Sequence, residues 1–223
     1  MEILAIIPAR GGSTEIPLKN LIKINNIPLL SYSIRSSLNS SFISRTIVST
    51  DHEKIKKSAL KSGAEVILRP KKLSGNVIGL EPTISHVLFY LKKTESYVPD
   101  IVVLLQNTSP LRTSSDIDYA IKKFKNGRFD SLLSGYISKH LFFKKQNNFL
   151  TPVNFSLKKW PNRQQMKNQF VGNGAIFITS FNAFQKSKCR ISGRIGLFEM
   201  PQEKSYEIDS KHDIFIVEKL LKK

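Results

Sequence analysis

The sequence predicts an α/β protein with a mainly parallel sheet, and three observations support this prediction. Short apolar runs rich in β-branched residues, such as residues 3–7 and 101–105, are typical of strands buried on both faces. Amphipathic helical patterns alternate with these runs along the chain. Gly, Pro and polar residues stand at the junctions. This alternation is typical of a sheet whose strands are joined by right-handed helical crossovers.

The first helix is expected between the first two strands. Residues 3–7 form a strand that Pro8 ends, and a Gly-bearing loop and connector follow to residue 27. Pro28 begins a helix that runs to residue 38, because Leu29, Leu30, Ile34 and Leu38 fall near one face. Residues 43–50 are predicted to be the second buried strand.

The next two helices have recognisable starts. Asp51 is expected to cap a helix over residues 52–62, which Gly63 ends. A third strand at 65–68 and a polar loop at 71–80 follow. Pro82 then begins a helix whose apolar face consists of Ile84, Val87, Leu88 and Leu91.

The second half of the chain continues the alternation with one interruption. Residues 138–170 are basic, irregular and hydrophobic in patches, so we expect an inserted arm for oligomerisation within a single domain spanning 1–223. The expected elements around it are a strand at 101–105, a helix capped by Ser115 or Asp116 and ending near 124, strands at 130–135, 175–179 and 195–200, and a last helix at 213–221 that Ser210 opens.

Composition excludes several classes of protein. No apolar run approaches the length of a membrane span, and the N-terminus, with Glu2, lacks the basic region of a signal peptide. The single cysteine, Cys189, excludes an internal disulfide and a cysteine cluster for zinc. We therefore expect a cytoplasmic protein.

The chain carries 35 Lys and Arg against 17 Asp and Glu, a net charge of +18. Such a charge raises nucleic acids, anionic membranes and small anions as partners. The cations are scattered or paired, however, without a basic tail or an RNA-binding signature. We therefore expect no nucleic acid and no membrane partner.

The loop after the first strand has the composition of a phosphate site. Residues 9–13 read Ala-Arg-Gly-Gly-Ser, and such glycines let backbone N–H groups approach an anion. The loop matches neither the dinucleotide fingerprint nor the Walker P-loop, so an ordinary turn with solvated cations is the alternative. Ligands of such sheets lie beyond the carboxyl ends of the strands, where loops 9–19, 49–51 and 106–112 should meet.

Three cations and three neutral polar residues fall on that side of the predicted sheet. Arg10, Lys19 and Arg69 together suggest a polyanion, most simply a nucleoside triphosphate, although each could be a surface ion pair. Hydrogen bonds suited to a polyhydroxylated ligand could come from Gln106, Thr108 and Ser109.

An acidic pair near the C-terminus is a candidate magnesium site. Glu207 and Asp209 flank Ile208, and in an extended segment side chains two apart point the same way. The alternative is a helix start with Asp209 or Ser210 as N-cap. Among the histidines, His140 in the arm could line a substrate site.

Several motifs, in order, resemble one family. They are IPARGGS…IPLKN at 7–20, IVSTD at 47–51, GAEVILRP at 63–70, LLQNTSPLR at 104–112, GNGAIF at 172–177, EMP at 199–201 and S-x-E-I-D-x-x-x-D at 205–213. Together they cover nearly the whole chain and resemble the acylneuraminate cytidylyltransferases, which include the CMP-sialic acid and CMP-legionaminic acid synthetases. The PLKN and QNTSPLR motifs favour the neuraminate or legionaminate branch over the pseudaminate branch.

The resemblance implies a fold and a reaction. The fold would be a three-layer, Rossmann-like nucleotidyltransferase of the glycosyltransferase-A type with a small dimerisation arm. The reaction would join CTP to a 2-keto nonulosonic acid with Mg2+, giving the CMP-sugar for surface glycans and pyrophosphate, in a homodimer.

The resemblance also implies a role for each matching residue. Arg10, Lys19 and Asp209 would be catalytic, and Glu207 and Asp209 would hold the metal. The nucleotide would be bound by Ala9, Arg10, Gly11, Gly12, Ser13, Lys19, Asn20 and Arg69. The sugar acid would be bound by Gln106, Thr108, Ser109, Arg112, His140, Lys144, Arg163 and Asn173.

Four departures from the family pattern bear on activity, and one of them is that residues 79–82 fit the serine-containing nucleotide loop of the family poorly. Thr14 and Glu15 replace the usual Lys-Gly of the phosphate loop, so a positive charge is lost and a negative one is gained. Glu207 replaces an aspartate, and Asn107 replaces a proline. The alternative function is therefore a weakened or inactive homologue that still binds nucleotide or sugar.

Overall fold

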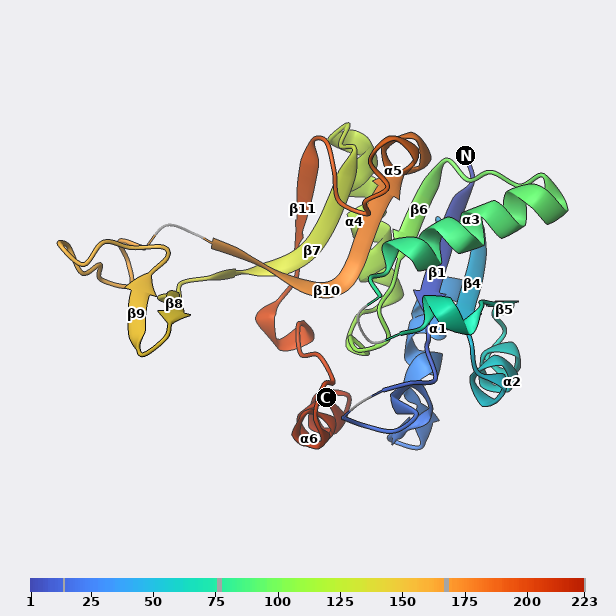
Figure 1. Cartoon of the computed structure of the whole chain (residues 1–223), viewed down its shortest axis with the longest axis horizontal. Helices are drawn as coiled ribbons and strands as arrows, with labels where there is room; N and C mark the ends of the chain where they lie inside the picture. The colour runs from blue at the N-terminus through green and yellow to red at the C-terminus, as the bar shows by residue number, and fades with distance from the viewer. Residues whose placement is uncertain (14, 76–77, 167–168, 223) are drawn as a thin grey trace.

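In the computed structural model, which describes residues 1–13, 15–75, 78–166 and 169–222, a seven-stranded sheet forms the centre of the protein (Figure 1). The strand order is β11-β7-β10-β6-β1-β4-β5. Only β10 runs antiparallel to its neighbours, β6 and β7. The strands are β1 (Ile3–Pro8), β4 (Arg45–Thr50), β5 (Glu65–Leu68), β6 (Ile101–Leu104), β7 (Ser131–Ser138), β10 (Gln169–Ser180) and β11 (Ile195–Glu199). The mainly parallel α/β sheet is thus confirmed.

Helices cover both faces of this sheet, which gives three layers. Helices α1 (Leu29–Leu38), α2 (Glu53–Lys61) and α4 (Ser114–Asn126) pack on one face around Ile34, Ile55 and Ile121. Helices α3 (Glu81–Glu95) and α5 (Phe181–Ser187) pack on the other around Leu88 and Phe184. Burial of both faces explains why the central strands are apolar without alternation.

A smaller cluster attaches the C-terminal helix to the N-terminal loop. Helix α6 (Lys211–Leu220) packs through Val217 against Ile16, Ile24 and Leu29, and Ile208 joins the same cluster. Two short strands, β2 (Lys23–Ile24) and β3 (Ile27–Pro28), form a hairpin inside the predicted connector. Three short 3-10 helices, η1 (Lys19–Leu21), η2 (Lys71–Leu73) and η3 (Gln202–Lys204), lie in loops.

Two predicted helix caps were wrong. His52, rather than Asp51, caps α2, because its Nδ1 accepts the Lys54 N–H at 3.2 Å. Helix α4 is capped by Thr113 in a reciprocal pair with Asp116, ahead of the predicted cap. Ser210 caps α6 as predicted.

The predicted strand ends also differ in places. Strand β4 begins at Arg45, two residues after the predicted start, and helix α5 was not predicted. Strand β10 begins at Gln169, well before the predicted 175, because Gln169–Gly172 pair with Ser138–Gly135 of β7 ahead of an irregularity between Gly172 and Phe177.

The long tails of β7 and β10 carry the arm away from the body (Figure 1). The prediction of a wholly irregular arm was wrong, since β8 (Phe143–Gln146) and β9 (Phe149–Pro152) form a hairpin. Phe155 packs between Phe143 and Trp160, with both ring-centroid distances at 5.1 Å. Within the described part of the chain, no helix is both long and apolar enough to cross a membrane.

Candidate functional site

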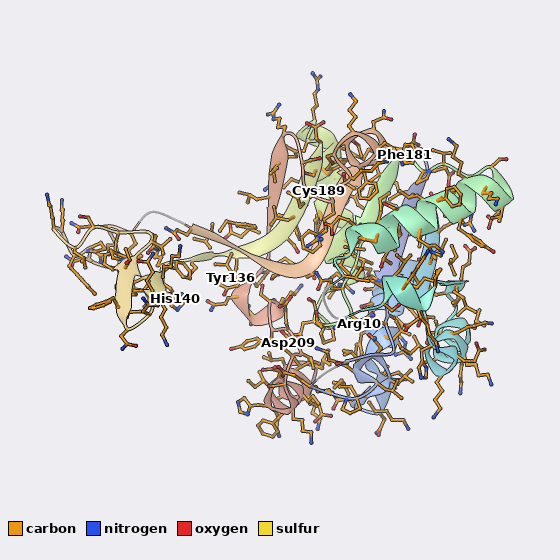
Figure 2. All side chains as sticks on the ribbon, in the orientation of Figure 1. Arg10, Tyr136, His140, Phe181, Cys189 and Asp209 are labelled. Carbon is orange, nitrogen blue, oxygen red and sulfur yellow. The ribbon has the colours of Figure 1, made fainter. Side chains whose placement is uncertain are left out.

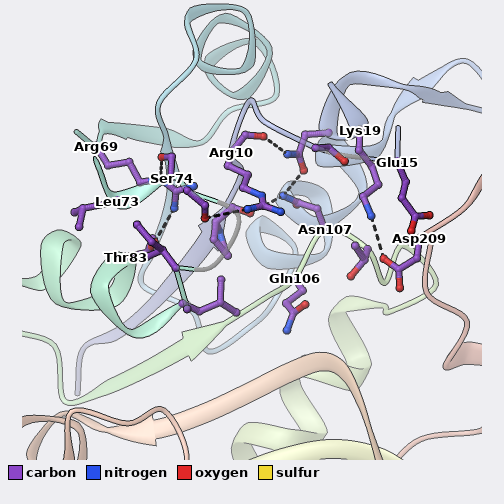
Figure 3. Close-up of a pocket in the computed structure, with 18 residues that line it drawn as sticks. Arg10, Glu15, Lys19, Arg69, Leu73, Ser74, Thr83, Gln106, Asn107 and Asp209 are labelled. Atoms are coloured by element: carbon purple, nitrogen blue, oxygen red, sulfur yellow. Dashed lines mark hydrogen bonds and ion pairs between the residues drawn. The ribbon is translucent and has the colours of Figure 1, made fainter. Parts of the chain in front are cut away.

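A cavity of about 560 Å³ opens beyond the carboxyl ends of β1 and β6 (Figure 3). The predicted site residues that line it are Arg10, Ser13, Lys19, Asn20, Arg69, Gln106, Thr108 and Asp209. The loop after β5 and the start of α3 add Leu73, Ser74, Gly75, Ile78, Gly79, Leu80 and Thr83. The carboxyl-end rule therefore located the pocket, although the sequence assigned no site role to the residues of this second wall, where residues 79–82 fit the nucleotide loop of the family poorly.

The phosphate loop is fixed to its neighbours by local hydrogen bonds. The Gly11 N–H donates to Asp51 Oδ1 at 2.9 Å. A Cβ at Gly11 would lie 2.7 Å from the His52 ring, so this position needs a glycine. Arg10 Nη1 donates to the Gly75 carbonyl at 3.1 Å and so connects the two walls. Because Asp51 holds Gly11, it serves the loop rather than α2.

The other residues of this loop differ in burial and in their place relative to the pocket. Ala9 is fully buried and donates its N–H to the Ser49 carbonyl at 2.9 Å, so only its backbone belongs to the site. Gly12 is exposed, with open space where a Cβ would stand. Thr14 lies outside the described residues, and Glu15 is exposed and lines the pocket (Figure 3). Glu15 thus adds a negative charge to a pocket that should receive a polyanion.

Arg69 forms part of the buried wall of the pocket. Its Nε donates to Ser74 Oγ at 2.9 Å and its Nη1 to Thr83 Oγ1 at 2.7 Å. Burial lowers the pKa of Arg69, Asp51 opposes that change, and the charge of Arg10 lowers the pKa further. Since Arg10 and Arg69 repel each other, a bound polyanion would offset this electrostatic repulsion.

Lys19 is paired with Asp209 across the pocket (Figure 3). Its Nζ lies 3.0 Å from Asp209 Oδ1 and donates to the Ile208 carbonyl at 3.0 Å. The Lys19 side chain is 17% exposed, whereas that of Asp209 is 67% exposed. The ammonium is therefore held in the wall while the carboxylate faces solvent.

The acidic segment is anchored between the pocket and the C-terminal cluster. The buried Ile208 donates its N–H to the Thr108 carbonyl at 2.8 Å. Glu207 is half-buried, and a Cβ at Gly174 would collide with its carboxylate. Burial, and secondarily the charge of Asp209, raises the pKa of Glu207 to about 7, against the opposing effect of Lys19.

Both carboxylates are oxygen donors of the kind that a hard divalent cation prefers, and of the two, Asp209 lines the cavity. Burial is the main cause of the raised pKa of Glu207, and a nearby dication would favour the ionised form of this carboxyl. Across the described residues, no group of three His, Cys, Asp or Glu side chains could hold a metal. Mg2+ typically binds through one or two carboxylates, with water and substrate phosphates completing its shell.

The raised pKa of Glu207 predicts a pH-dependent stability in metal-free buffer. Because the native carboxyl holds its proton up to about pH 7 and the unfolded one only to about 4.5, the free energy of unfolding falls as pH rises through this range. Chemical denaturation at several pH values measures this fall, and Glu207→Gln should flatten it. The same slope in the variant would contradict the assignment.

Arg112 does not reach the pocket, in contrast to its predicted contact with the sugar acid. It is 3% exposed, and its Nη1 donates to the carbonyls of Ala175 at 2.7 Å and Gln106 at 3.1 Å. Its Nη2 donates to Ser33 Oγ at 2.7 Å, and its Nε donates to Ser36 Oγ at 3.4 Å. Burial lowers the pKa of Arg112 to about 10, so it remains a cation at neutral pH. Arg112 therefore supports the pocket floor from behind.

Asn173 and Ser109 are also part of the frame rather than the pocket surface. Asn173 is 4% exposed, accepts from Ser134 Oγ at 2.6 Å and donates to Ser205 Oγ at 2.9 Å. The fully buried Ser109 donates its hydroxyl to the Asn173 carbonyl at 3.4 Å. Through Ser205, Asn173 anchors the segment that carries the acidic pair.

The predicted arm residues lie outside the pocket of their own chain. His140, Lys144 and Arg163 are exposed, and none of them lines the cavity. Figure 2 shows His140 at the base of the arm, well separated from Arg10 and Asp209. His140 Nδ1 is hydrogen-bonded to Ser138 Oγ at 2.7 Å. The chain alone therefore does not bring these residues to the site.

The sequence profile described as "Cytidylyltransferase" matches residues 4–222. The chain is 29% identical to "Post-translational flagellin modification protein B" of Campylobacter coli, over 99% of this chain and 95% of that protein. It is also 29% identical to a pseudaminic acid cytidylyltransferase of Campylobacter jejuni, over 96% of this chain and 94% of that protein. An Escherichia coli N-acylneuraminate cytidylyltransferase is 31% identical over 95% of this chain, which spans 50% of that longer protein.

Solved structures show the same fold. The structure of CMP:2-keto-3-deoxy-manno-octonic acid synthetase complexed with CTP aligns with a TM-score of 0.72 at 16% identity, over 100% of this chain and 99% of that one. A cytidylyltransferase from Leptospira borgpetersenii aligns with a TM-score of 0.58 at 21% identity, over 96% and 83%. These findings confirm the resemblance and the three-layer nucleotidyltransferase fold inferred from the sequence.

Proposed function

The chain belongs to the cytidylyltransferase family, and we propose that it joins CTP to a 2-keto nonulosonic acid to give the CMP-sugar and pyrophosphate. One observation carries the proposal: Arg10, Lys19 and Arg69 line one pocket at the carboxyl ends of the strands. Three cations there fit a triphosphate. The reaction would use cytoplasmic CTP and supply sugar for surface glycans.

In the proposed reaction, the anomeric hydroxyl of the sugar acid attacks the α-phosphorus of CTP. The new O–P bond forms as the bond to pyrophosphate breaks, and the hydroxyl proton leaves to solvent. Arg10, Lys19 and Arg69 would hold the phosphates and stabilise the charge that develops on them. Gln106 and Thr108 line the same pocket and would orient the sugar acid.

Magnesium would bind at Glu207 and Asp209. When bound, it would neutralise the triphosphate and favour ionisation of the attacking hydroxyl. The side chain of the frame residue Asn173 and the backbone carbonyl of Thr108 hold the 205–209 segment beside the pocket, so they would keep both carboxylates in place.

A panel assay tests the proposed reaction. The purified protein is incubated with CTP, Mg2+ and a set of 2-keto sugar acids that includes neuraminate, legionaminate and pseudaminate, and released pyrophosphate is measured. We expect turnover with one nonulosonate. Relatives of the neuraminate and pseudaminate types match at similar identity, so the panel also decides the branch. CTP binding without turnover on any sugar would support the weakened homologue, which no comparison favours.

We also propose that the protein is a homodimer formed through the arm. Phe149 is 77% exposed and Trp160 60% exposed, with Leu150, Val153 and Leu157 beside them in the sequence and also exposed. Apolar side chains gathered on a projecting hairpin are typical of an interface. A dimer would allow His140, Lys144 and Arg163 of one copy to reach the pocket of the other.

The arm proposal predicts that Phe149→Lys with Trp160→Glu gives a monomer. Charges placed in an apolar interface are costly to bury, so the dimer should dissociate at micromolar concentration. Light scattering on a sizing column measures the mass. The matched control is Phe215→Glu on α6, an aromatic residue that is 60% exposed outside the arm and should leave the dimer intact. A dimeric arm variant would refute the interface.

A further inference from the structure

Asn107 lies in the segment that the sequence connects with the sugar acid, but its side chain contacts the phosphate loop. It is 4% exposed. Its Nδ2 donates to the Pro8 carbonyl at 3.0 Å and to Asn20 Oδ1 at 2.9 Å. Both N–H groups of one amide are therefore engaged by residues of the phosphate loop.

Pro8 and Asn20 are the two ends of that loop. Pro8 closes β1, and Asn20 follows Lys19 on the far side of the glycines. Asn20 Nδ2 also donates to the Arg10 carbonyl at 2.9 Å. A chain of hydrogen bonds thus runs from Asn107 through Asn20 to the backbone of Arg10. Asn107 thereby ties the two ends of the loop together, and we call its two hydrogen bonds to Pro8 and Asn20 the clasp.

The orientation of the Asn107 amide follows from its partners. Rotating the amide by 180° would bring Oδ1 against two acceptors, so Nδ2 must face Pro8 and Asn20. In this orientation Oδ1 is buried without a hydrogen-bond partner among the described residues. An unpaired buried carbonyl is costly, and the two donated bonds compensate for it.

The backbone that carries Asn107 is itself held firmly. The Leu105 N–H donates to the Ile6 carbonyl at 3.0 Å, and the Gln106 carbonyl accepts from Arg112 at 3.1 Å. The clasp therefore acts from a fixed platform onto a Gly-rich loop, and it adds to the hydrogen bonds that Gly11 and Arg10 make with Asp51 and Gly75.

We propose that Asn107 is a positioning residue for the nucleotide: it preorganises the phosphate loop so that Arg10 and Lys19 meet the triphosphate. The inference rests on the proposed use of CTP. It assigns control of CTP binding to Asn107, which lines the cavity beside Gln106 but donates both N–H groups of its amide to residues of the phosphate loop. Without the clasp, the loop would keep only its other hydrogen bonds, and the order that the clasp supplies would have to form at the moment of binding, which weakens affinity.

The test is the affinity for CTP, measured by calorimetry with no sugar acid present. Asn107→Leu keeps the shape and removes both donors, and we expect the Kd for CTP to rise about tenfold, which is ~1.4 kcal/mol. The KM for CTP should rise in parallel, while the KM for the sugar acid changes less than twofold. A wild-type protein that does not bind CTP would refute the proposed function. Wild-type binding with an unchanged Kd in the variant would refute the clasp alone.

Two further variants separate the clasp from a general loss of structure. Asn107→Asp retains the shape but places a carboxylate oxygen against the two acceptors, so it should weaken CTP binding at least as much as Asn107→Leu does. Its circular dichroism spectrum should remain native. Asn20→Ala should weaken CTP binding by itself. When Asn107→Leu is added to Asn20→Ala, the Kd for CTP should rise by less than the tenfold that Asn107→Leu causes in the wild-type protein. If the rise in Kd of the double variant equals the product of the rises in the two single variants, Asn107 does not act through Asn20, and this result would overturn the proposal.

Discussion

Asp209→Asn is expected to abolish most turnover and yet to tighten CTP binding in metal-free buffer. Turnover should fall by roughly 10²–10³-fold, the loss typical of removing one group that stabilises transition-state charge. Without metal, however, Asp209 holds Lys19 at 3.0 Å and adds a negative charge to the pocket. Since an exposed ion pair is worth roughly 0.2–1 kcal/mol, its removal should lower the metal-free Kd by a factor of roughly 1.4 to 5.

The matched control is Glu15→Gln, which removes the same charge from the same pocket. Glu15 makes no ion pair among the described residues, so its loss should tighten CTP similarly with and without Mg2+ while turnover is retained. Calorimetry in EDTA and a pyrophosphate assay in Mg2+ measure the two effects. Full turnover in Asp209→Asn would exclude Asp209 as a metal ligand. Weaker CTP binding by this variant in metal-free buffer would exclude the idea that Asp209 competes with CTP for Lys19.

Arg112→Met is expected to lower the free energy of unfolding by roughly 3–5 kcal/mol, because it removes the donor of several buried acceptors, each of which costs about 1–3 kcal/mol when left unpaired. Methionine fills a similar volume but leaves the Ala175 carbonyl and the Ser33 hydroxyl without the Arg112 donor, and the Gln106 carbonyl with only the 3.4 Å hydrogen bond from Ser33 Oγ. For a chain of this size the melting temperature should fall by roughly 10 °C. Urea denaturation and calorimetry measure both quantities.

Two variants show whether this loss comes from the buried hydrogen bonds. Arg35→Met on α1 removes an exposed guanidinium, and its effect should stay within about 0.5 kcal/mol. Arg112→Lys keeps the charge but not the planar fork, so most of the loss should remain. Equal, small effects at Arg112 and Arg35 would mean that the buried network does not stabilise the fold.

Much of the fold could be predicted because burial imposes a local pattern. Strands β1 and β6 each differ from the predicted bounds by one residue at one end, since a strand buried on both faces is apolar throughout. Strand β5 has the predicted bounds, although it is a partly exposed edge strand. Helix α1 likewise begins one residue after Pro28. The arm hairpin was missed because its residues are mostly exposed, so no core dictates their pattern.

The location of the site could also be predicted from the sequence. Parallel strands bring their carboxyl ends to one edge, so Arg10, Arg69 and Gln106 had to lie near one another. The family motifs added Lys19, Asn20 and Asp209, all of which line the same pocket. Sequence alone thus determined the sheet, its central strands, the edge that holds the pocket and the cations that gather there.

Only the tertiary structure decided what each polar side chain does at that edge. Arg112 and Asn173 turn inward as a frame, and Asn107 turns toward the phosphate loop. Their partners are Ala175, Ser205 and Pro8, which lie far from them in sequence. A loop residue has no periodicity to fix its direction, so its orientation follows from donors and acceptors that only the folded chain brings within hydrogen-bonding distance.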